Sequence, residues 1–141
     1  MRHPSSSISR SSRKSGMTLL ELTIVILVLM SLISILFVGA QAWKRGSDRT
    51  MCIMNIQTMQ KAMRSYANLY GYGDGDSVAA LRERLVGSGR YLETAPTCPG
   101  GGSYNYGEEY GTDTIPPIGD LYLSCSLSSS QNHVPANHAE W

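Results

Sequence analysis

Charged side chains are scarce in this chain of 141 residues. They make up 16% of it, against about a quarter in ordinary soluble domains. The formal net charge is only +1, so the basic excess typical of nucleic-acid-binding proteins is absent and no nucleic-acid partner is predicted. No charged residue occurs between Leu22 and Trp43, and no proline occurs between Met17 and Tyr70. These absences exclude an ordinary soluble enzyme and indicate one long helix whose first half is apolar.

The chain also lacks the patterns that carry catalysis or hold a metal. The three glycines at 100–102 are not followed by the Lys-Ser/Thr pair of a phosphate-binding loop. Serines gather near the two ends of the chain, and no nucleophile, base and acid can be grouped from the sequence. His133 and His138 follow Cys125, but a second pair with zinc-ligand spacing is missing. We therefore predict no enzyme activity, no cofactor and no metal centre, with calcium, treated below, as the one exception.

The apolar run from Leu22 to Trp43 is the most prominent feature that is present. About 20 helical residues cross the hydrocarbon core of a bilayer, so this run is long enough to span it once. Basic residues and no acidic one precede it within residues 1–16, which favours a cytoplasmic N-terminus and a C-terminal domain outside the inner membrane. Ala40 and Ala42 offer a signal-peptidase site. The run is therefore a membrane anchor or a cleavable signal. A third interpretation depends on the junction that precedes it.

The junction that precedes the apolar run has a pattern of its own. The basic stretch ends at Gly16, Met17 follows, and a single carboxylate, Glu21, stands at the start of the apolar helix. This pattern resembles the N-terminal segment of the type IV prepilins, including the pseudopilins of type II secretion. The resemblance at full strength covers about residues 13–40. Met17 stands where phenylalanine is commonest in the family, and methionine is a tolerated variant.

The resemblance implies a processed structural subunit. A prepilin peptidase would cut between Gly16 and Met17, and the new N-terminal Met17 would be N-methylated. The freed α-amine has a pKa of about 7.7–8 and is mostly cationic, so Glu21 can pair with it. In the family the favoured pairing joins neighbouring subunits of a helical filament. The implied partners are the peptidase, copies of this chain and other pilin-like subunits, an inner-membrane assembly platform and membrane lipid. The implied product is a type II secretion pseudopilus or a type IV pilus-like filament, in the periplasm or at the cell surface.

Two other functions stay open from the sequence alone. Cleavage after Ala42 would release a small soluble binding protein that begins at Trp43. An uncut leader would leave a monomeric protein anchored in the membrane. Neither alternative explains the spacing between Gly16 and Glu21.

The composition changes sharply after Tyr70, where most of the glycines and prolines lie, and this change predicts the end of the long helix. Before that point, apolar residues recur at helical spacing and predict a buried stripe on the second half of the helix. The stripe consists of Cys52, Ile56, Met59, Met63, Tyr66 and Tyr70. The expected divisions are a leader (1–16), a membrane or filament-core helix (17–43), an amphipathic helix half (44–70), a small α+β part (71–126) and a Ser-rich tail (127–141).

The C-terminal region predicts a sparse α+β domain. A short helix is expected over Ser77–Val86 with Asp76 as its N-cap. Alternating tyrosines at 104–106 and the run 119–126 each indicate a strand. The expected fold is one long N-terminal helix that packs by its second half on a short helix and a two- to three-stranded antiparallel sheet. The tail, residues 127–141, shows no periodicity and is expected to be poorly ordered.

Two stretches of this region, Pro99–Tyr106 and Asp120–Tyr122, resemble strand openings of the major pseudopilin of type II secretion. That protein usually has an Asp-Gly-rich calcium loop near its C-terminus, whereas this chain has a Ser-rich tail. Glu108, Asp113 and Asp120, in and next to the loop between the two strands, are calcium candidates. The alternative is ordinary solvated loop charge.

All three cysteines follow the apolar run, so they lie in an oxidising compartment if the domain is periplasmic. Cys98 and Cys125 each lie at the edge of a predicted strand, and we expect a disulfide between them. Chain-entropy arguments give such a bond about 3–4 kcal/mol of stabilisation. Cys52 would then be a buried thiol on the helix stripe. Pairing of Cys52 with one of the other two cysteines is the alternative.

Overall fold

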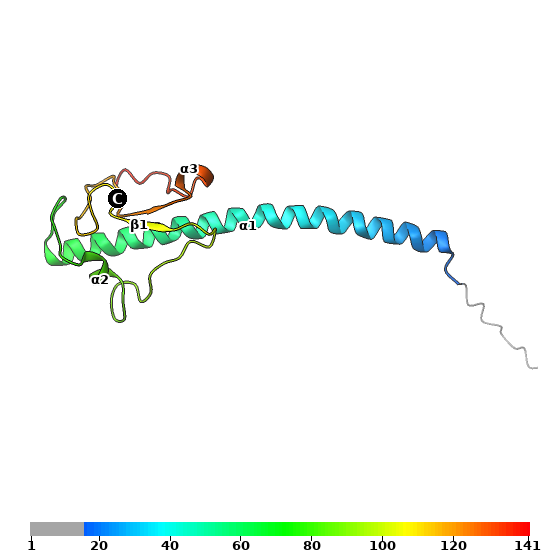
Figure 1. Cartoon of the computed structure of the whole chain (residues 1–141), viewed down its shortest axis with the longest axis horizontal. Coiled ribbons are helices and arrows are strands. Elements are labelled where there is room, and N and C mark those ends of the chain that lie inside the picture. The colour runs from blue at the N-terminus through cyan, green and yellow to red at the C-terminus, as the bar shows by residue number, and fades with distance from the viewer. Residues whose placement is uncertain (1–15) are drawn as a thin grey trace, which may run out of the picture. The chain divides into compact units, whose positions relative to one another are not determined.

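The computed structural model describes residues 16–141 (Figure 1). The elements are α1 (Leu19–Tyr70), α2 (Leu81–Leu85), β1 (Tyr104–Tyr106), β2 (Leu123–Cys125) and α3 (Ser128–Gln131). This confirms one long N-terminal helix followed by a small part with a short helix and an antiparallel sheet, an α+β arrangement. The chain divides into an N-terminal unit, up to Gly39, and a C-terminal unit, Ala40–Trp141. Apart from Gly16, the predicted basic leader lies outside the described residues.

The described part of the N-terminal unit is a helix that is apolar on every side. Each of residues 16–39 is exposed, and the large apolar side chains between Leu19 and Val38 are 45–81% exposed. The few hydroxyls bond to the helix's own carbonyls, as Ser31 Oγ does to Val28 O at 2.8 Å, so they leave no polar group unpaired. A helix of this length and composition could cross a membrane.

The second half of α1, in the C-terminal unit, carries the core. The predicted stripe is confirmed at five positions: Cys52, Ile56, Met59, Met63 and Tyr66 are all buried. The sixth is wrong, since Tyr70 is 62% exposed. It lies at the last position of the helix, where Gly71 adopts a positive φ of 74° and Tyr72 N donates to Ala67 O at 2.9 Å. This glycine-based cap ends the helix and turns the chain away before Tyr70 can be covered.

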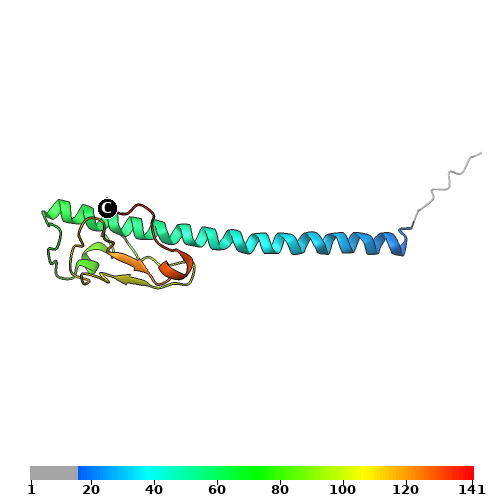
Figure 2. The same cartoon turned by 90° about the horizontal axis from the view of Figure 1, so that it is seen from above.

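The sheet has two strands among residues 16–141, β1 and β2, paired antiparallel with Tyr104 opposite Cys125 and Tyr106 opposite Leu123. Leu123 and Cys125 are buried, whereas Ser124 between them is only half-buried, as the alternation of side chains along a strand requires. Both views show the two strands beside the second half of α1 (Figures 1 and 2). The stripe on α1 and the inner face of β2 share one hydrophobic core with Val78, Leu81, Leu85, Ile115 and Tyr122.

The predicted short helix is shorter than expected, and its predicted cap is wrong. It begins at Leu81 instead of Ser77, after Ala80 in the left-handed conformation with φ 57°. Asp76 does not cap it, because its Oδ2 accepts a hydrogen bond from Gly73 N at 2.6 Å within the preceding turn. The first helical amide, Leu81 N, donates instead to Asp113 Oδ1 at 3.3 Å. Asp113, which is distant in sequence, therefore accepts the hydrogen bond that Asp76 was expected to accept.

The Ser-rich tail is also more ordered than its composition predicts. It forms α3, and His133 and Pro135 are buried. Its last residue is fixed by two hydrogen bonds to Trp141 O, from Gly119 N at 3.1 Å and from an Arg64 Nη at 3.0 Å. The prediction of a poorly ordered tail is therefore wrong, because serine content says nothing about the few apolar and aromatic side chains that anchor a segment.

One buried polar side chain on α1 was not singled out by the sequence. Gln60, which is 2% exposed, accepts a hydrogen bond from Tyr122 N at 2.9 Å and donates to Asp120 O at 3.0 Å. Its amide thus satisfies the backbone just before β2, where no neighbouring strand is available. This contact fixes the position of β2 along α1.

Candidate functional site

Two groups of residues have the chemistry to act as sites, and the first is the N-terminal junction. Gly16 and Met17 precede α1 in non-helical backbone, and both are exposed. Glu21 lies in the first turn of α1, where its backbone amide donates to Thr18 Oγ1 at 3.3 Å. Among residues 16–141 the one ion pair joins Arg64 and Asp74. Within the described chain the carboxylate of Glu21 is therefore exposed and without an ionic partner.

The three calcium candidates each lie beside a different hydrogen-bond donor. Glu108 accepts a hydrogen bond from Ser124 Oγ, Asp113 accepts from Leu81 N, and Asp120 accepts from the Tyr110 hydroxyl at 2.8 Å. Each carboxylate thus has a separate structural partner. The described residues contain no group of these acids close enough to share a cation.

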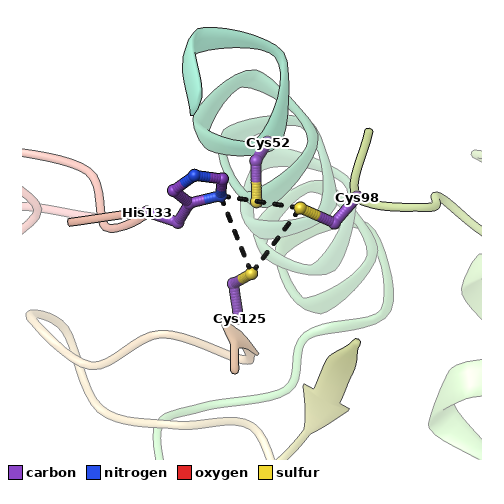
Figure 3. A group of neighbouring side chains, drawn as sticks. All are labelled: Cys52, Cys98, Cys125 and His133. Atoms are coloured by element: carbon purple, nitrogen blue, oxygen red, sulfur yellow. Dashed lines mark hydrogen bonds between the residues drawn. The ribbon is translucent and has the colours of Figure 1, made fainter. Parts of the chain in front are cut away.

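The second group is a buried cluster of Cys52, Cys98, Cys125 and His133, called here the Cys3His cluster (Figure 3). Cys52 comes from α1, Cys98 from the loop before β1, Cys125 from the end of β2, and His133 from the segment after α3. Their side chains converge from four directions, and none is more than 8% exposed. One ligating atom from each residue lies within 4.8 Å of every other.

The expected Cys98–Cys125 disulfide is absent, and all three cysteines are free thiols. The sequence correctly placed these two cysteines next to each other, but their sulfurs are 3.8 Å apart, whereas a disulfide requires about 2.05 Å. Pairing of Cys52 with either of them is equally absent. His133 Nδ1 lies 3.5 Å from Cys98 Sγ and 4.0 Å from Cys125 Sγ. The imidazole nitrogen therefore lies close to both sulfurs.

Glycines let the backbone approach this cluster. A Cβ on Gly100 would lie 2.8 Å from the His133 ring, and one on Gly102 would lie 2.9 Å from Cys125 Sγ. The triple glycine of the sequence thus has a packing reason, since any side chain at two of its positions would displace a member of the cluster. Gly101, between them, adopts a positive φ of 84° and closes the turn through a hydrogen bond to Cys98 O at 3.1 Å.

A second layer of hydrogen bonds holds the cysteine-bearing segments. Asn55, one turn beyond Cys52, donates to Thr97 O at 3.1 Å and to the Tyr104 hydroxyl at 3.2 Å. Tyr104 in turn lies 3.2 Å from Cys52 Sγ through the same hydroxyl. One amide side chain therefore ties α1 both to the residue before Cys98 and to the strand partner of Cys125.

The surroundings push the pKa values of two of the thiols in opposite directions. Burial raises the pKa of Cys52 to about 12, and the hydrogen bond with Tyr104 offsets only part of that effect. Burial also disfavours ionisation of Cys98, but hydrogen bonds from Cys52, from the amides of Gly102 and Gly100, and from Cys125 outweigh it and lower its pKa. Cys98 is therefore the thiol that ionises more readily, and Cys52 stays protonated near neutral pH unless a positive charge lies beside it.

His133 is the member that sequence reasoning missed. The spacing of Cys125 and His133 suits a ligand pair, but the sequence contains no second pair of neighbouring ligands, and zinc is not predicted from it. The structure supplies the other two ligand atoms from positions 52 and 98, on separate segments. His138 takes no part, since its Nδ1 contacts Pro135 O at 2.9 Å.

Comparisons with known proteins identify no relative: no protein-family model, no curated protein and no solved structure matches this chain.

Proposed function

We propose that this chain is a pilin-like structural subunit, cut by a prepilin peptidase after Gly16 and assembled through its N-terminal helix into a pseudopilus or pilus-like filament. The observation that carries the proposal is an N-terminal helix segment that is apolar on all sides. A single carboxylate lies in its first turn, without an ionic partner among residues 16–141, and the Gly16–Met17 junction lies directly before it. The resemblance of that junction to the type IV prepilins implies the cleavage reaction and the peptidase that carries it out.

The exposed apolar surface of the N-terminal unit needs a cover. Large side chains such as Leu27, Ile35 and Leu36 are each 71% exposed, and apolar surface costs about 25 cal/mol per Å² when it is left in water. Contiguous patches of this kind mark a membrane or protein interface. Lipid would cover the helix while the subunit waits in the inner membrane, and neighbouring subunits' helices would cover it in the filament.

Glu21 fits the assembly step because its charge needs a partner once the helix leaves the membrane interface. A carboxylate within an apolar phase costs about 2.5–3.5 kcal/mol on insertion scales. Cleavage after Gly16 creates a cationic amine at Met17, and pairing between adjacent subunits neutralises both charges. That pairing would also fix the axial register of one subunit against the next.

The C-terminal unit has its own core, so it suits the outer surface of a filament. Its buried side chains come from α1, α2, β2 and the loops between them, and it does not need the apolar segment to cover them. With a cytoplasmic N-terminus, as the basic residues before the apolar run favour, this unit would lie in the periplasm. The anchor would be a single pass through the inner membrane.

Replacing Gly16 with valine should block processing. The peptidase is expected to accept no side chain at this position, and the chain itself offers no obstacle, because a Cβ on Gly16 would have no atom within 4 Å. We expect the G16V chain to accumulate at full length in the membrane, as shown by its mobility on a denaturing gel and by its intact mass.

Gly39→Val is the matched control, since a Cβ on Gly39 would also have no atom within 4 Å, yet this glycine lies beyond the junction. We expect G39V to be cut normally. Normal cutting of G16V, or an equal block in both variants, would contradict recognition at Gly16.

A further inference from the structure

We propose that the Cys3His cluster is a structural zinc site in which Zn²⁺ is bound by the sulfurs of Cys52, Cys98 and Cys125 and by Nδ1 of His133. This inference concerns the C-terminal unit alone and stands whether or not the chain is a filament subunit.

The distances between the ligand atoms match a tetrahedral centre. Zinc binds sulfur at about 2.3 Å and imidazole nitrogen at about 2.0–2.1 Å, so the edges of the tetrahedron are about 3.8 Å between two sulfurs and about 3.5 Å between sulfur and nitrogen. The Cys98–Cys125 sulfurs are 3.8 Å apart, and His133 Nδ1 lies 3.5 Å and 4.0 Å from them. These three edges fit a tetrahedron, and the Cys52 sulfur lies within 4.8 Å of the other three ligand atoms.

The number, kind and burial of the ligands indicate a structural role. Four protein ligands complete the coordination of zinc and leave no position for a substrate or a catalytic water. Thiolates with one imidazole favour zinc over hard cations such as calcium and magnesium, which prefer oxygen. All four residues are buried. A disulfide would use only two of them and leave a thiol and an imidazole without a function in the core.

The surroundings favour the charge that such a centre would have. Three thiols that bind Zn²⁺ release three protons, and the resulting centre has a net charge of −1. A surface pocket beside His133 brings two cationic side chains, Arg45 and Arg49, close to the cluster. It is lined by Arg45, Gly46, Arg49, Gln131 and His133.

The metal would join four segments that come from separate parts of the chain. The sheet has only three residue pairs, and α2 and α3 are each about one turn long. Zinc would attach the loop before β1, the end of β2 and the C-terminal tail to α1 at a single point. Small domains with little core commonly depend on such a metal, and its binding free energy then becomes folding free energy.

The test is the metal content of the full-length protein, purified in detergent from membranes without chelators. We expect about one zinc per chain by elemental mass spectrometry. After exchange into Co²⁺, we expect thiolate-to-cobalt charge-transfer absorption and the intense visible bands of tetrahedral cobalt. These measurements on the natural chain do not depend on whether any variant folds. A metal-free protein with a Cys98–Cys125 disulfide would overturn the proposal, and so would stoichiometric iron or copper in place of zinc.

Variants identify the ligands. Cys52→Ser and His133→Gln should each weaken zinc binding by at least about 100-fold, measured by competition with a chromogenic chelator. His138→Gln is the matched control, because it removes the neighbouring tail histidine that lies outside the cluster, and it should bind like the natural chain. Unchanged affinity in C52S or H133Q, or loss of zinc in H138Q, would refute this ligand set. Binding should also weaken as the pH falls, because protons compete for the thiolates.

Discussion

Glu21→Ala should abolish filament assembly and leave processing after Gly16 intact. The variant removes the one carboxylate at the start of the apolar segment, so the cationic amine of the cut subunit loses its partner in the neighbouring subunit. A loss of assembly by at least about 100-fold corresponds to about 2.7 kcal/mol per contact, within the cost of an unpaired charge in an apolar phase. The measurement compares sheared filaments with membrane-bound protein by immunoblot and by electron microscopy.

Two further variants separate charge from shape and position. Glu21→Gln keeps the size of the side chain but not its charge, so it should behave like the alanine variant. Asp48→Asn removes a carboxylate from the same helix outside the apolar run and should assemble normally. Filaments formed by E21A or E21Q at the natural level would refute the pairing role of Glu21.

Gly107→Ala should unfold the C-terminal unit or destabilise it severely. Gly107 has a φ of +58°, and a Cβ there would overlap the backbone carbonyl of Gly111. The same turn is fixed by two hydrogen bonds, from Gly107 N to Tyr122 O and from Gly111 N to Gly107 O, both 2.8 Å long. Left-handed strain of about 1–2 kcal/mol and overpacking of about 1–3 kcal/mol together cost about 2–5 kcal/mol, a large part of a typical unfolding free energy of about 5–15 kcal/mol.

Thermal unfolding of the full-length protein in detergent, followed by near-ultraviolet circular dichroism, measures this effect. Gly89→Ala is the matched control, because Gly89 has a similar positive φ of 72° but nothing lies within 4 Å of its Cβ position. G89A should show only the backbone strain, and its midpoint should fall far less than that of G107A. Equal unfolding midpoints for the two variants would show that the overlap with Gly111 does not destabilise the protein.

The long helix and the two strands could be predicted because their signals are local. The absence of proline, the uncharged run and the spacing of the stripe from Cys52 to Tyr66 each depend on residues a few positions apart. The alternating tyrosines of β1 have the same property. The start of α2 could not be predicted, because Asp113, far along the chain, supplies the acceptor that Asp76 was expected to provide.

The Cys3His cluster could be predicted only in part for a related reason. Its members come from four separate segments, and only Cys125 and His133 are close enough in sequence to suggest a pair. The expected disulfide correctly identified Cys98 and Cys125 as neighbours but not the chemistry between them. The Ser-rich composition of the tail gave no sign that His133 is buried. Without that histidine, three cysteines favour the prediction of a disulfide over that of a metal site.

The N-terminal residue and intact mass of the protein from its native membrane test the central claim most directly. The proposed function predicts a chain that begins at N-methylated Met17 and lacks residues 1–16. A soluble product that begins at Trp43 would contradict it and make the C-terminal unit a secreted protein. An intact Met1 in a host with an active prepilin peptidase would contradict it equally and leave a plain membrane anchor.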